Sequence, residues 1–139
     1  MEKNKERQHP LNPDARILEL RSHAYSCGEA TLCGMADALG LDMDENFLRA
    51  ISVGFRGGIG ASFGKGTCGA LSGAVIAAGL AFSDDPKRAT AAARTLYEAF
   101  IDKLGTVACG DMHHKGRDHC NDCCLFAAKT LCNIIESEA

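Results

Sequence analysis

Apolar side chains recur along most of this chain with the spacing of helices, and polar or glycine-rich segments separate the repeats. The first repeat starts at Asn12-Pro13-Asp14, where a capping residue, a proline and an acid suit the first turn of a helix. The periodicity predicts a helix from there to about Ala24. Residues 1–11 are polar, which predicts a flexible N-terminal arm.

A capping box predicts the start of the second helix. Ser26 is followed three residues later by Glu29, so each side chain can hydrogen-bond the backbone of the other residue. The helix is expected from Cys27 to about Leu39, with Gly40 as the left-handed residue that ends it. A third, short helix is expected to carry the apolar residues Phe47, Leu48 and Ile51.

Glycine dominates the middle of the chain. Six of the thirteen residues from Gly54 to Gly66 are glycine, which predicts a loop without helix or strand. Thr67 is expected to cap the next helix, which ends near Phe82. Small residues recur at every fourth position of this helix and favour close packing against another helix. They are Gly69, Gly73 and Ala77.

Two long helices are expected in the C-terminal part of the chain. Asp84-Asp85-Pro86 begins one of them, and Gly105 ends it. A polar turn follows, and Asp118 is expected to cap the last helix, which runs to about Ile135. No segment alternates with the strand period over more than about five residues. The sequence therefore predicts one compact all-α domain over residues 12–139. This domain is a bundle of five or six helices with a Gly-rich loop.

Composition limits the classes of function. The chain has 139 residues, the size of one ordinary domain, and 46% of them are hydrophobic. A net charge of −3 argues against nucleic acid as a partner, because phosphate binding needs a basic face. The N-terminus lacks the apolar region of a secretory signal, and the apolar residues 70–82 are too few to span a bilayer. We therefore expect a cytoplasmic location and no direct membrane span.

Eight cysteines are the most informative feature of the composition. Cytosolic thiols are mostly reduced, so this number favours metal binding or redox chemistry over structural disulfides. Four of the cysteines fall at or near predicted helix N-termini, where free N–H groups and the helix dipole lower a thiol pKa towards neutrality. These four are Cys27, Cys68, Cys109 and Cys120.

The other cysteines and the histidines have weaker signals. Cys33 and Cys132 are expected in the core. Cys120, Cys123 and Cys124 share one face of the last helix, a pattern found both in metal or resolving-thiol clusters and in plain core packing. The histidines near the polar turn are expected to be exposed to solvent rather than to act as ligands. They are His113, His114 and His119.

The glycine-rich segment does not match the standard nucleotide-binding motifs. A phosphate loop would need glycine in place of Ile59, and a dinucleotide fingerprint would need glycine in place of Phe63. We instead expect glycines here to bring backbone amides close to the thiolate site or to its cofactor. The glycines assigned to this role are Gly57, Gly58 and Gly60.

The segment Cys68-Gly69-Ala70-Leu71-Ser72-Gly73 resembles the Cys-Gly-Ala-x-x-Gly signature of a redox-active bacterial family named C_GCAxxG_C_C. Residues 25–30, 54–60 and 100–109, and the residues that follow Cys120, resemble other segments of that family. The resemblance covers about residues 15–135 and implies the same four cysteines that the helix termini select. It departs at Gly110-Asp111, where the family commonly has a helix-forming stretch.

Three functions are open at this point. In the first, the four cysteines bind an iron–sulfur cluster or another metal for electron transfer. In the second, they perform thiol–disulfide exchange, with Cys68 as the first nucleophile and Cys27 or Cys109 as the resolving thiol. In the third, the chain is a non-catalytic scaffold or interaction domain with structural cysteines or zinc, and it forms a homodimer through the small-residue face of residues 69–77. Either redox function would need a redox partner protein, and the sequence leaves open whether the chain is an enzyme.

Overall fold

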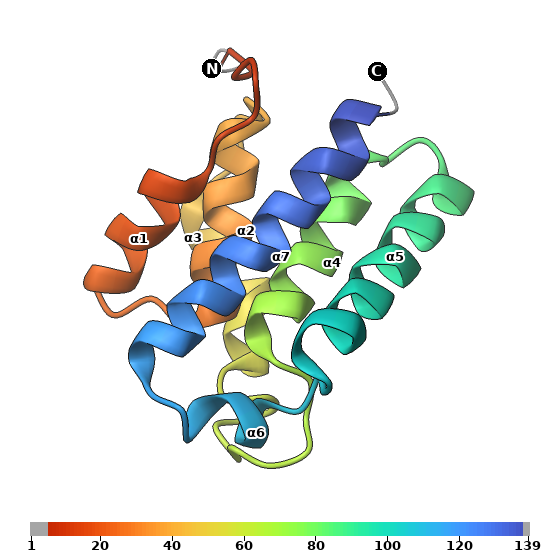
Figure 1. The fold of residues 1–139 in the computed structure, drawn as a ribbon. Helices are drawn as coiled ribbons and strands as arrows, with labels where there is room; N and C mark the ends of the chain where they lie inside the picture. Colours follow the sequence, from red (N-terminus) through yellow and green to blue (C-terminus); the bar gives the residue numbers. More distant parts are fainter. Residues whose placement is uncertain (1–5, 138–139) are drawn as a thin grey trace.

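The computed structural model describes residues 6–137, and seven α-helices account for most of them (Figure 1). In chain order they are α1 (Asp14–Ser22), α2 (Cys27–Ala38), α3 (Glu45–Ser52), α4 (Gly69–Ala81), α5 (Pro86–Leu104), α6 (Cys109–His113) and α7 (Arg117–Ser137). One turn of 3-10 helix, Val53–Phe55, follows α3. The described residues contain no strand, so the predicted all-helical fold is confirmed. No helix among them is long and apolar enough to cross a membrane.

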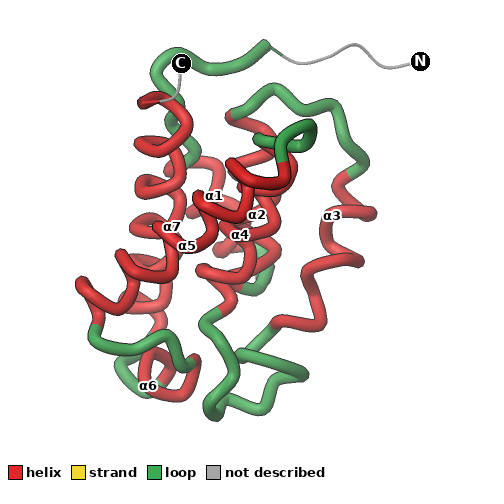
Figure 2. The backbone as a smooth tube through the Cα atoms, turned by 90° about the vertical axis from the view of Figure 1, so that its right-hand side faces the viewer, coloured by secondary structure: helices red, strands yellow, loops and turns green. Residues whose placement is uncertain are grey.

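Helices α2, α4 and α7 form the centre of the bundle and contact one another. Helices α1 and α3 pack against α2, and α5 packs against α4 and α7 (Figures 1 and 2). The three central helices all begin at the same end of the bundle, where the short α6 lies (Figure 1). We call this the cavity end, because a cavity opens there. Because the positive ends of three helix dipoles converge there, the cavity end favours negative charge.

Glycines let α2 and α4 approach each other closely near their N-termini. A Cβ atom added to Gly73 would lie 2.6 Å from the carbonyl oxygen of Gly28, and one added to Gly69 would lie 3.1 Å from the Gly28 nitrogen. The predicted close-packing face is therefore confirmed, and α2 is the helix that covers it. The small residues of that face are buried inside the chain, so a homodimer, which stays a prediction, would need another surface than residues 69–77.

Three local predictions at the helix ends are corrected by the structure. Cys68, rather than Thr67, is the N-cap of α4, and no side chain caps this helix. Asp118 lies within the first turn of α7 rather than before it. The predicted polar turn contains α6, which raises the number of helices in the described residues to seven. Thr106 stabilises the start of α6 by donating a hydrogen bond of 2.7 Å to the Asp111 carboxylate.

The described part of the N-terminal arm contacts the bundle. The Gln8 amide donates a hydrogen bond of 3.0 Å to the carbonyl oxygen at the end of α2. The Leu11 amide donates one of 2.8 Å to the Glu136 carboxylate on α7, and the Leu11 side chain is buried in the core. The arm is thus attached to both helices at these positions, and residues 1–5 lie outside the described residues.

Candidate thiol site

One cavity opens at the cavity end of the bundle, with a volume of about 200 Å³. Its wall contains residues of α1, α2, α4, α6, α7 and the glycine-rich segment. All four cysteines selected from the sequence lie in this wall: Cys27, Cys68, Cys109 and Cys120. The structure contains all eight cysteines as free thiols. The site is therefore a group of reduced sulfur atoms that come from the first turns or caps of four helices.

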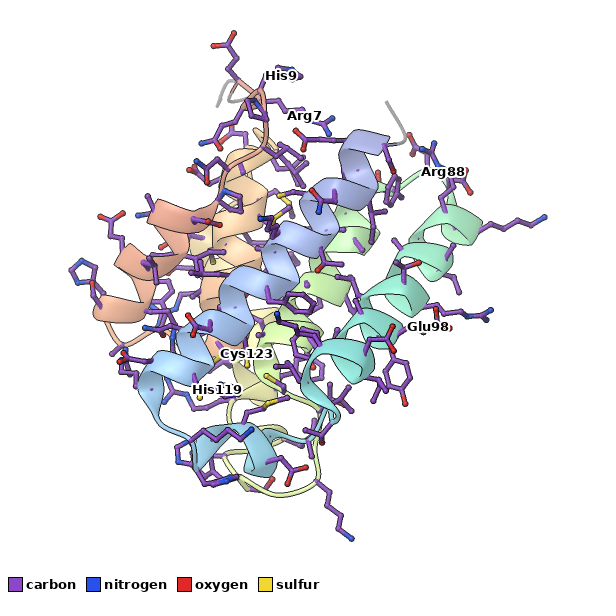
Figure 3. The ribbon with its side chains drawn as sticks, in the orientation of Figure 1. Arg7, His9, Arg88, Glu98, His119 and Cys123 are labelled. Atoms are coloured by element: carbon purple, nitrogen blue, oxygen red, sulfur yellow. The ribbon has the colours of Figure 1, made fainter. Side chains whose placement is uncertain are left out.

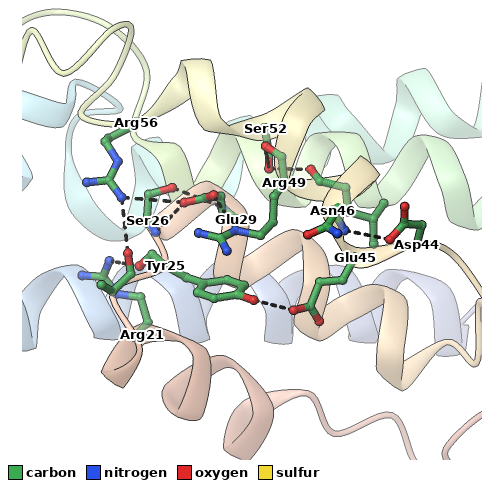
Figure 4. Close-up of polar contacts among 12 residues, drawn as sticks. Arg21, Tyr25, Ser26, Glu29, Asp44, Glu45, Asn46, Arg49, Ser52 and Arg56 are labelled. Atoms are coloured by element: carbon green, nitrogen blue, oxygen red, sulfur yellow. Dashed lines mark hydrogen bonds and ion pairs between the residues drawn. The ribbon is translucent and has the colours of Figure 1, made fainter.

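The capping box places Cys27 as the first residue of α2, as the sequence predicts. The Ser26 hydroxyl accepts a hydrogen bond of 3.4 Å from the Glu29 amide, and the Glu29 carboxylate accepts one of 2.9 Å from the Ser26 amide. Glu29 is only 1% exposed and also accepts a bond of 2.9 Å from Arg49 Nε (Figure 4). The Arg56 guanidinium lies 3.8 Å from the same carboxylate. The two arginines compensate the buried charge of Glu29. They therefore connect the turn before Cys27 to α3 and to the segment that follows α3.

A short backbone ladder places Cys68 and Cys109 near each other. The Cys68 amide donates a hydrogen bond of 2.6 Å to the Val107 carbonyl oxygen, and the Cys109 amide donates one of 2.7 Å to the Gly66 carbonyl oxygen. An antiparallel bridge lies between these two bonds. The ladder therefore joins the end of the glycine-rich segment to the start of α6 and brings two cysteines that are distant in sequence to one cavity.

Cysteines on α7 contact cysteines from the other central helices. The Cys120 thiol lies against the Cys27 thiol, and the Cys123 thiol lies against the Cys68 thiol. Cys124 also hydrogen-bonds the Cys27 thiol, and its sulfur lies 3.9 Å from the Cys27 carbonyl oxygen. Figure 3 shows Cys123 on α7 at the cavity end. The sulfur atoms are therefore arranged in two groups, Cys27 with Cys120 and Cys124, and Cys68 with Cys123.

Cys68 has a lowered thiol pKa. The hydrogen bond from the Cys123 thiol has the largest effect, and burial opposes it. Backbone N–H groups of Ala70 and Leu71 in the first turn of α4, and the positive charge of Arg21, lower the pKa further. The net result is a Cys68 pKa of about 7. A large fraction of Cys68 is therefore thiolate at neutral pH, which is the nucleophilic form.

The predicted acidity is wrong for the other three cysteines of the cavity wall. The hydrogen bond with Cys120 lowers the pKa of Cys27, but the bond with Cys124 and burial raise it by more. The hydrogen bond to Cys27 and burial raise the pKa of Cys120. Burial and the neighbouring thiols raise the pKa of Cys109. A helix N-terminus is thus not sufficient, because desolvation and a second thiol outweigh the dipole at these positions.

Three arginines line the cavity, and its described wall contains no acidic residue. Arg21 on α1 is 7% exposed, and it donates hydrogen bonds of 2.8 Å to the Asn121 side-chain oxygen and 3.0 Å to the Tyr25 carbonyl oxygen. Arg117 donates to the Arg21 carbonyl oxygen, and Arg56 donates a bond of 3.3 Å to a backbone oxygen just before α2. Three arginines so far apart in sequence form no motif, so only the fold identifies them as part of the site.

The glycine-rich segment forms one side of the cavity. Gly57 lies in the cavity wall. Gly58 has a φ of +89°, and a Cβ atom there would lie 3.2 Å from the Cβ of Cys109, so glycine is required for this close contact. A Cβ atom on Gly60 would meet nothing within 4 Å, so packing does not require glycine there. Cofactor binding by these three glycines stays a prediction.

The histidines differ in their surroundings. His113 and His114 are exposed, as expected, and the His113 ring stacks on Phe63 with 4.3 Å between ring centroids. His119 is half-buried, and its Nε2 atom has no hydrogen-bond partner among the described residues. In Figure 3 it lies on α7 at the cavity end.

Metal binding at the four cysteines, one of the predicted functions, is not confirmed. Across residues 6–137, no group of three or more histidine, cysteine, aspartate or glutamate side chains is placed to hold a metal ion. Metal binding by the four cysteines therefore stays a prediction, and the function proposed below contains no metal step.

The cysteines outside the predicted set fall into two groups. Cys33 and Cys132 lie in the core as expected, and burial raises the pKa of each to about 12. Cys123 and Cys124 are also buried, yet both contact a cysteine of the cavity wall. Cys123 is the residue of the site that sequence analysis did not separate from core packing. Its spacing of three residues from Cys120 was the available signal.

The fold and the site together define an all-helical protein whose cavity is lined by free cysteines from separate helices. Residues 25–134 match the model of the family described as "Putative redox-active protein (C_GCAxxG_C_C)", and the match covers most of the chain. The chain belongs to this family. No match was found among curated proteins, and none among solved structures. At the predicted departure from the family pattern, Gly110 and Asp111 lie within the helix α6.

Proposed function

We propose that this protein performs thiol–disulfide exchange, with Cys27, Cys68, Cys109 and Cys120 as its thiol site. The observation that carries the proposal is the contact between Cys68 and Cys123. It joins a cavity-wall thiol of lowered pKa to a second thiol whose pKa is raised by that same hydrogen bond and by burial. A nucleophilic thiolate and an adjacent resolving thiol are the two components that exchange requires.

The reaction begins at Cys68. Its thiolate attacks one sulfur of a substrate disulfide, which forms a mixed disulfide and releases the other sulfur as a thiolate that takes up a proton. The Cys123 thiol then loses its proton and attacks the Cys68 sulfur, so the mixed disulfide breaks and the second substrate thiol leaves with a proton. The substrate gains two electrons and two protons, and the protein retains a disulfide between Cys68 and Cys123. A small reducing dithiol that enters the cavity returns both cysteines to thiols by the reverse exchange.

The remaining cavity cysteines support this assignment of roles. Cys27 and Cys120 are hydrogen-bonded to each other, and their raised pKa values keep both protonated at neutral pH. They therefore do not compete with Cys68 as the first nucleophile and form a second, less reactive dithiol. The sequence suggested Cys27 or Cys109 as the resolving thiol. Cys123 takes that role in the proposal because its thiol contacts Cys68 directly.

Mapping of the linkages formed by a small disulfide tests this function. Reduced protein is mixed with hydroxyethyl disulfide, quenched with acid and analysed by peptide mass spectrometry. We expect a disulfide between Cys68 and Cys123 in the wild type, and a stable hydroxyethyl adduct on Cys68 in Cys123→Ser. Cys132→Ser is the matched control and should behave as the wild type, because Cys132 lies in the core. A first adduct on Cys27 or Cys109, or an intact thiol at Cys68, would contradict the proposal.

A further inference from the structure

We propose that the cavity selects small anionic disulfides, in which a carboxylate lies a few atoms from the S–S bond. This inference rests on the proposed exchange function and adds the class of substrate. Its basis is the charge of the cavity wall together with the size and burial of the site. The protein as a whole has a net charge of −3, so a cationic cavity is a local feature and not a consequence of composition.

The arginines of the cavity keep charge that no neighbouring carboxylate neutralises. Arg21 is 7% exposed, yet its hydrogen bonds go to an amide oxygen and a carbonyl oxygen, which are neutral acceptors. Arg117 also donates to a carbonyl oxygen. Within residues 6–137, no ion pair involves either side chain. The Cys68 thiolate is the one negative group of the wall that interacts with Arg21, so Arg117 and part of the charge of Arg56 are left for an anionic ligand.

The third arginine is only partly neutralised. Arg56 lies 3.8 Å from Glu29, but the same carboxylate accepts a shorter bond of 2.9 Å from Arg49. Arg56 is half-exposed at the cavity wall and can turn towards a ligand. The N-termini of α2 and α4 lie at the same wall and add positive potential. Three guanidinium groups and two helix N-termini therefore face one thiolate, Cys68, and the net potential of the wall favours an anion.

Size and burial restrict the ligand to a small molecule. The cavity volume of about 200 Å³ is below the range of ordinary drug-sized sites. Cys68 is only 4% exposed, so the surface disulfide of a folded protein would not reach its sulfur without rearrangement. A short dicarboxylate disulfide can place its S–S bond against Cys68 while a carboxylate meets the guanidinium groups.

Protection of Cys68 by an unreactive anion tests the binding site without a redox step. Suberate has the length and the two carboxylates of dithiodipropionate but contains no sulfur, and octanediol is its uncharged counterpart. We expect suberate, and not octanediol, to slow the alkylation of Cys68 by iodoacetamide by about fivefold or more. Equal alkylation with suberate and with octanediol would overturn the proposal.

Charge-removing variants connect this protection to the cavity. Arg117→Gln should abolish the effect of suberate, and Arg56→Gln provides a second variant if the first fails to fold. Arg94→Gln is the matched control, because Arg94 is exposed on α5 and lies outside the cavity wall. It should retain the protection. The same protection in every variant would place the anion elsewhere and overturn the proposal.

Rates with three disulfides of different charge test substrate selection. Dithiodipropionate is anionic, hydroxyethyl disulfide is neutral and cystamine is cationic, and each rate is divided by the rate of the same disulfide with mercaptoethanol. We expect the anion to react about tenfold faster than the cation at low ionic strength, with a smaller ratio at high salt. Equal normalised rates would overturn the anion selectivity alone. Suberate protection without reaction of any disulfide would instead overturn the exchange function and leave the anion site standing.

Discussion

The cavity end and the apolar interior of the bundle contain the same residue type in two different chemical states. At the cavity end, Cys68 receives hydrogen bonds from a second thiol and from two backbone amides, and its pKa falls to about 7. Away from the cavity, Cys33 and Cys132 are buried in the hydrophobic core cluster, and burial raises the pKa of each to about 12. The reactivity of a cysteine in this fold therefore depends on the donors that reach its sulfur and not on burial alone, since Cys68 is buried as well.

The raised pKa values of Cys27, Cys109 and Cys120 sharpen this contrast. These residues share the cavity wall with Cys68 but lack its balance of donors. Among the four cysteines of the cavity wall, only Cys68, at the start of α4, has a lowered pKa.

The largest expected difference between the two regions is in the rate of disulfide exchange. Cys68→Ser should slow the reaction of the reduced protein with hydroxyethyl disulfide by about 100-fold or more, because the nucleophile is lost. Cys132→Ser should leave the rate within about twofold of the wild type. Stopped-flow detection of the released mercaptoethanol measures both rates. A Cys68→Ser protein that keeps most of the wild-type rate would remove the distinction between the regions.

The close approach of α2 and α4 should dominate the stability of the cavity end. Gly73→Ala introduces a Cβ atom 2.6 Å from a backbone oxygen of α2, and overpacking of this kind lowers the free energy of unfolding by about 1–3 kcal/mol. Gly79→Ala on the same helix meets nothing within 4 Å and should raise it by up to ~1 kcal/mol. Urea denaturation compares the two variants. A stable Gly73→Ala protein would show that the helices do not need this contact.

Removal of a helix cap at the cavity end can be compared with removal of a cap at a control position. Ser26→Ala removes the side-chain cap of α2, and Asp44→Ala removes that of α3, so each should lower the free energy of unfolding by about 1 kcal/mol. Loosening of the first turn of α2 should also speed the alkylation of Cys27 in Ser26→Ala. Asp44→Ala should leave that rate unchanged. Equal effects of both variants on Cys27 would mean that the cap does not position the thiol.

The two regions should also show an opposite dependence of stability on pH. The Cys68 pKa is about 7 in the folded protein and 9.0 in the unfolded chain, so ionisation of this thiol adds stability as pH rises from about 7 to 9. The Cys132 pKa is raised to about 12, so its contribution is full below pH 9 and is lost as pH rises further. Urea denaturation of Cys68→Ala and Cys132→Ala against wild type at several pH values measures both trends. A stabilisation by Cys68 that falls over pH 7–9 would contradict the lowered pKa.

Local signals in the sequence were sufficient for the helices and for most of their ends. The Ser26 and Glu29 capping box, the proline at the start of α5 and the left-handed Gly105 act within one turn, so each can be read from neighbouring residues. The start of α4 could not be read in this way. Its N-cap, Cys68, is held by a backbone ladder to residues 107–109, which depends on the tertiary fold.

The same limit applies to the site. The four cysteines could be selected because each lies near a helix start. Their pKa values could not be predicted from the sequence, because each value depends on which thiol donates to which sulfur across α2, α4 and α7. Arg21 and Arg117 come from opposite ends of the chain and meet only when α1 and α7 pack together. The cysteines of the cavity can therefore be predicted from the sequence, but their pKa values depend on contacts between residues that are distant in the sequence.

The most direct test of the account is the alkylation of each cysteine as a function of pH. Reduced protein is treated briefly with iodoacetamide at a series of pH values, and peptide mass spectrometry reports the modified fraction of every cysteine. We expect a midpoint near pH 7 for Cys68 and no comparable reaction of Cys33 or Cys132 below about pH 9. A midpoint for Cys68 at or above the ordinary thiol value of 9.0 would contradict it.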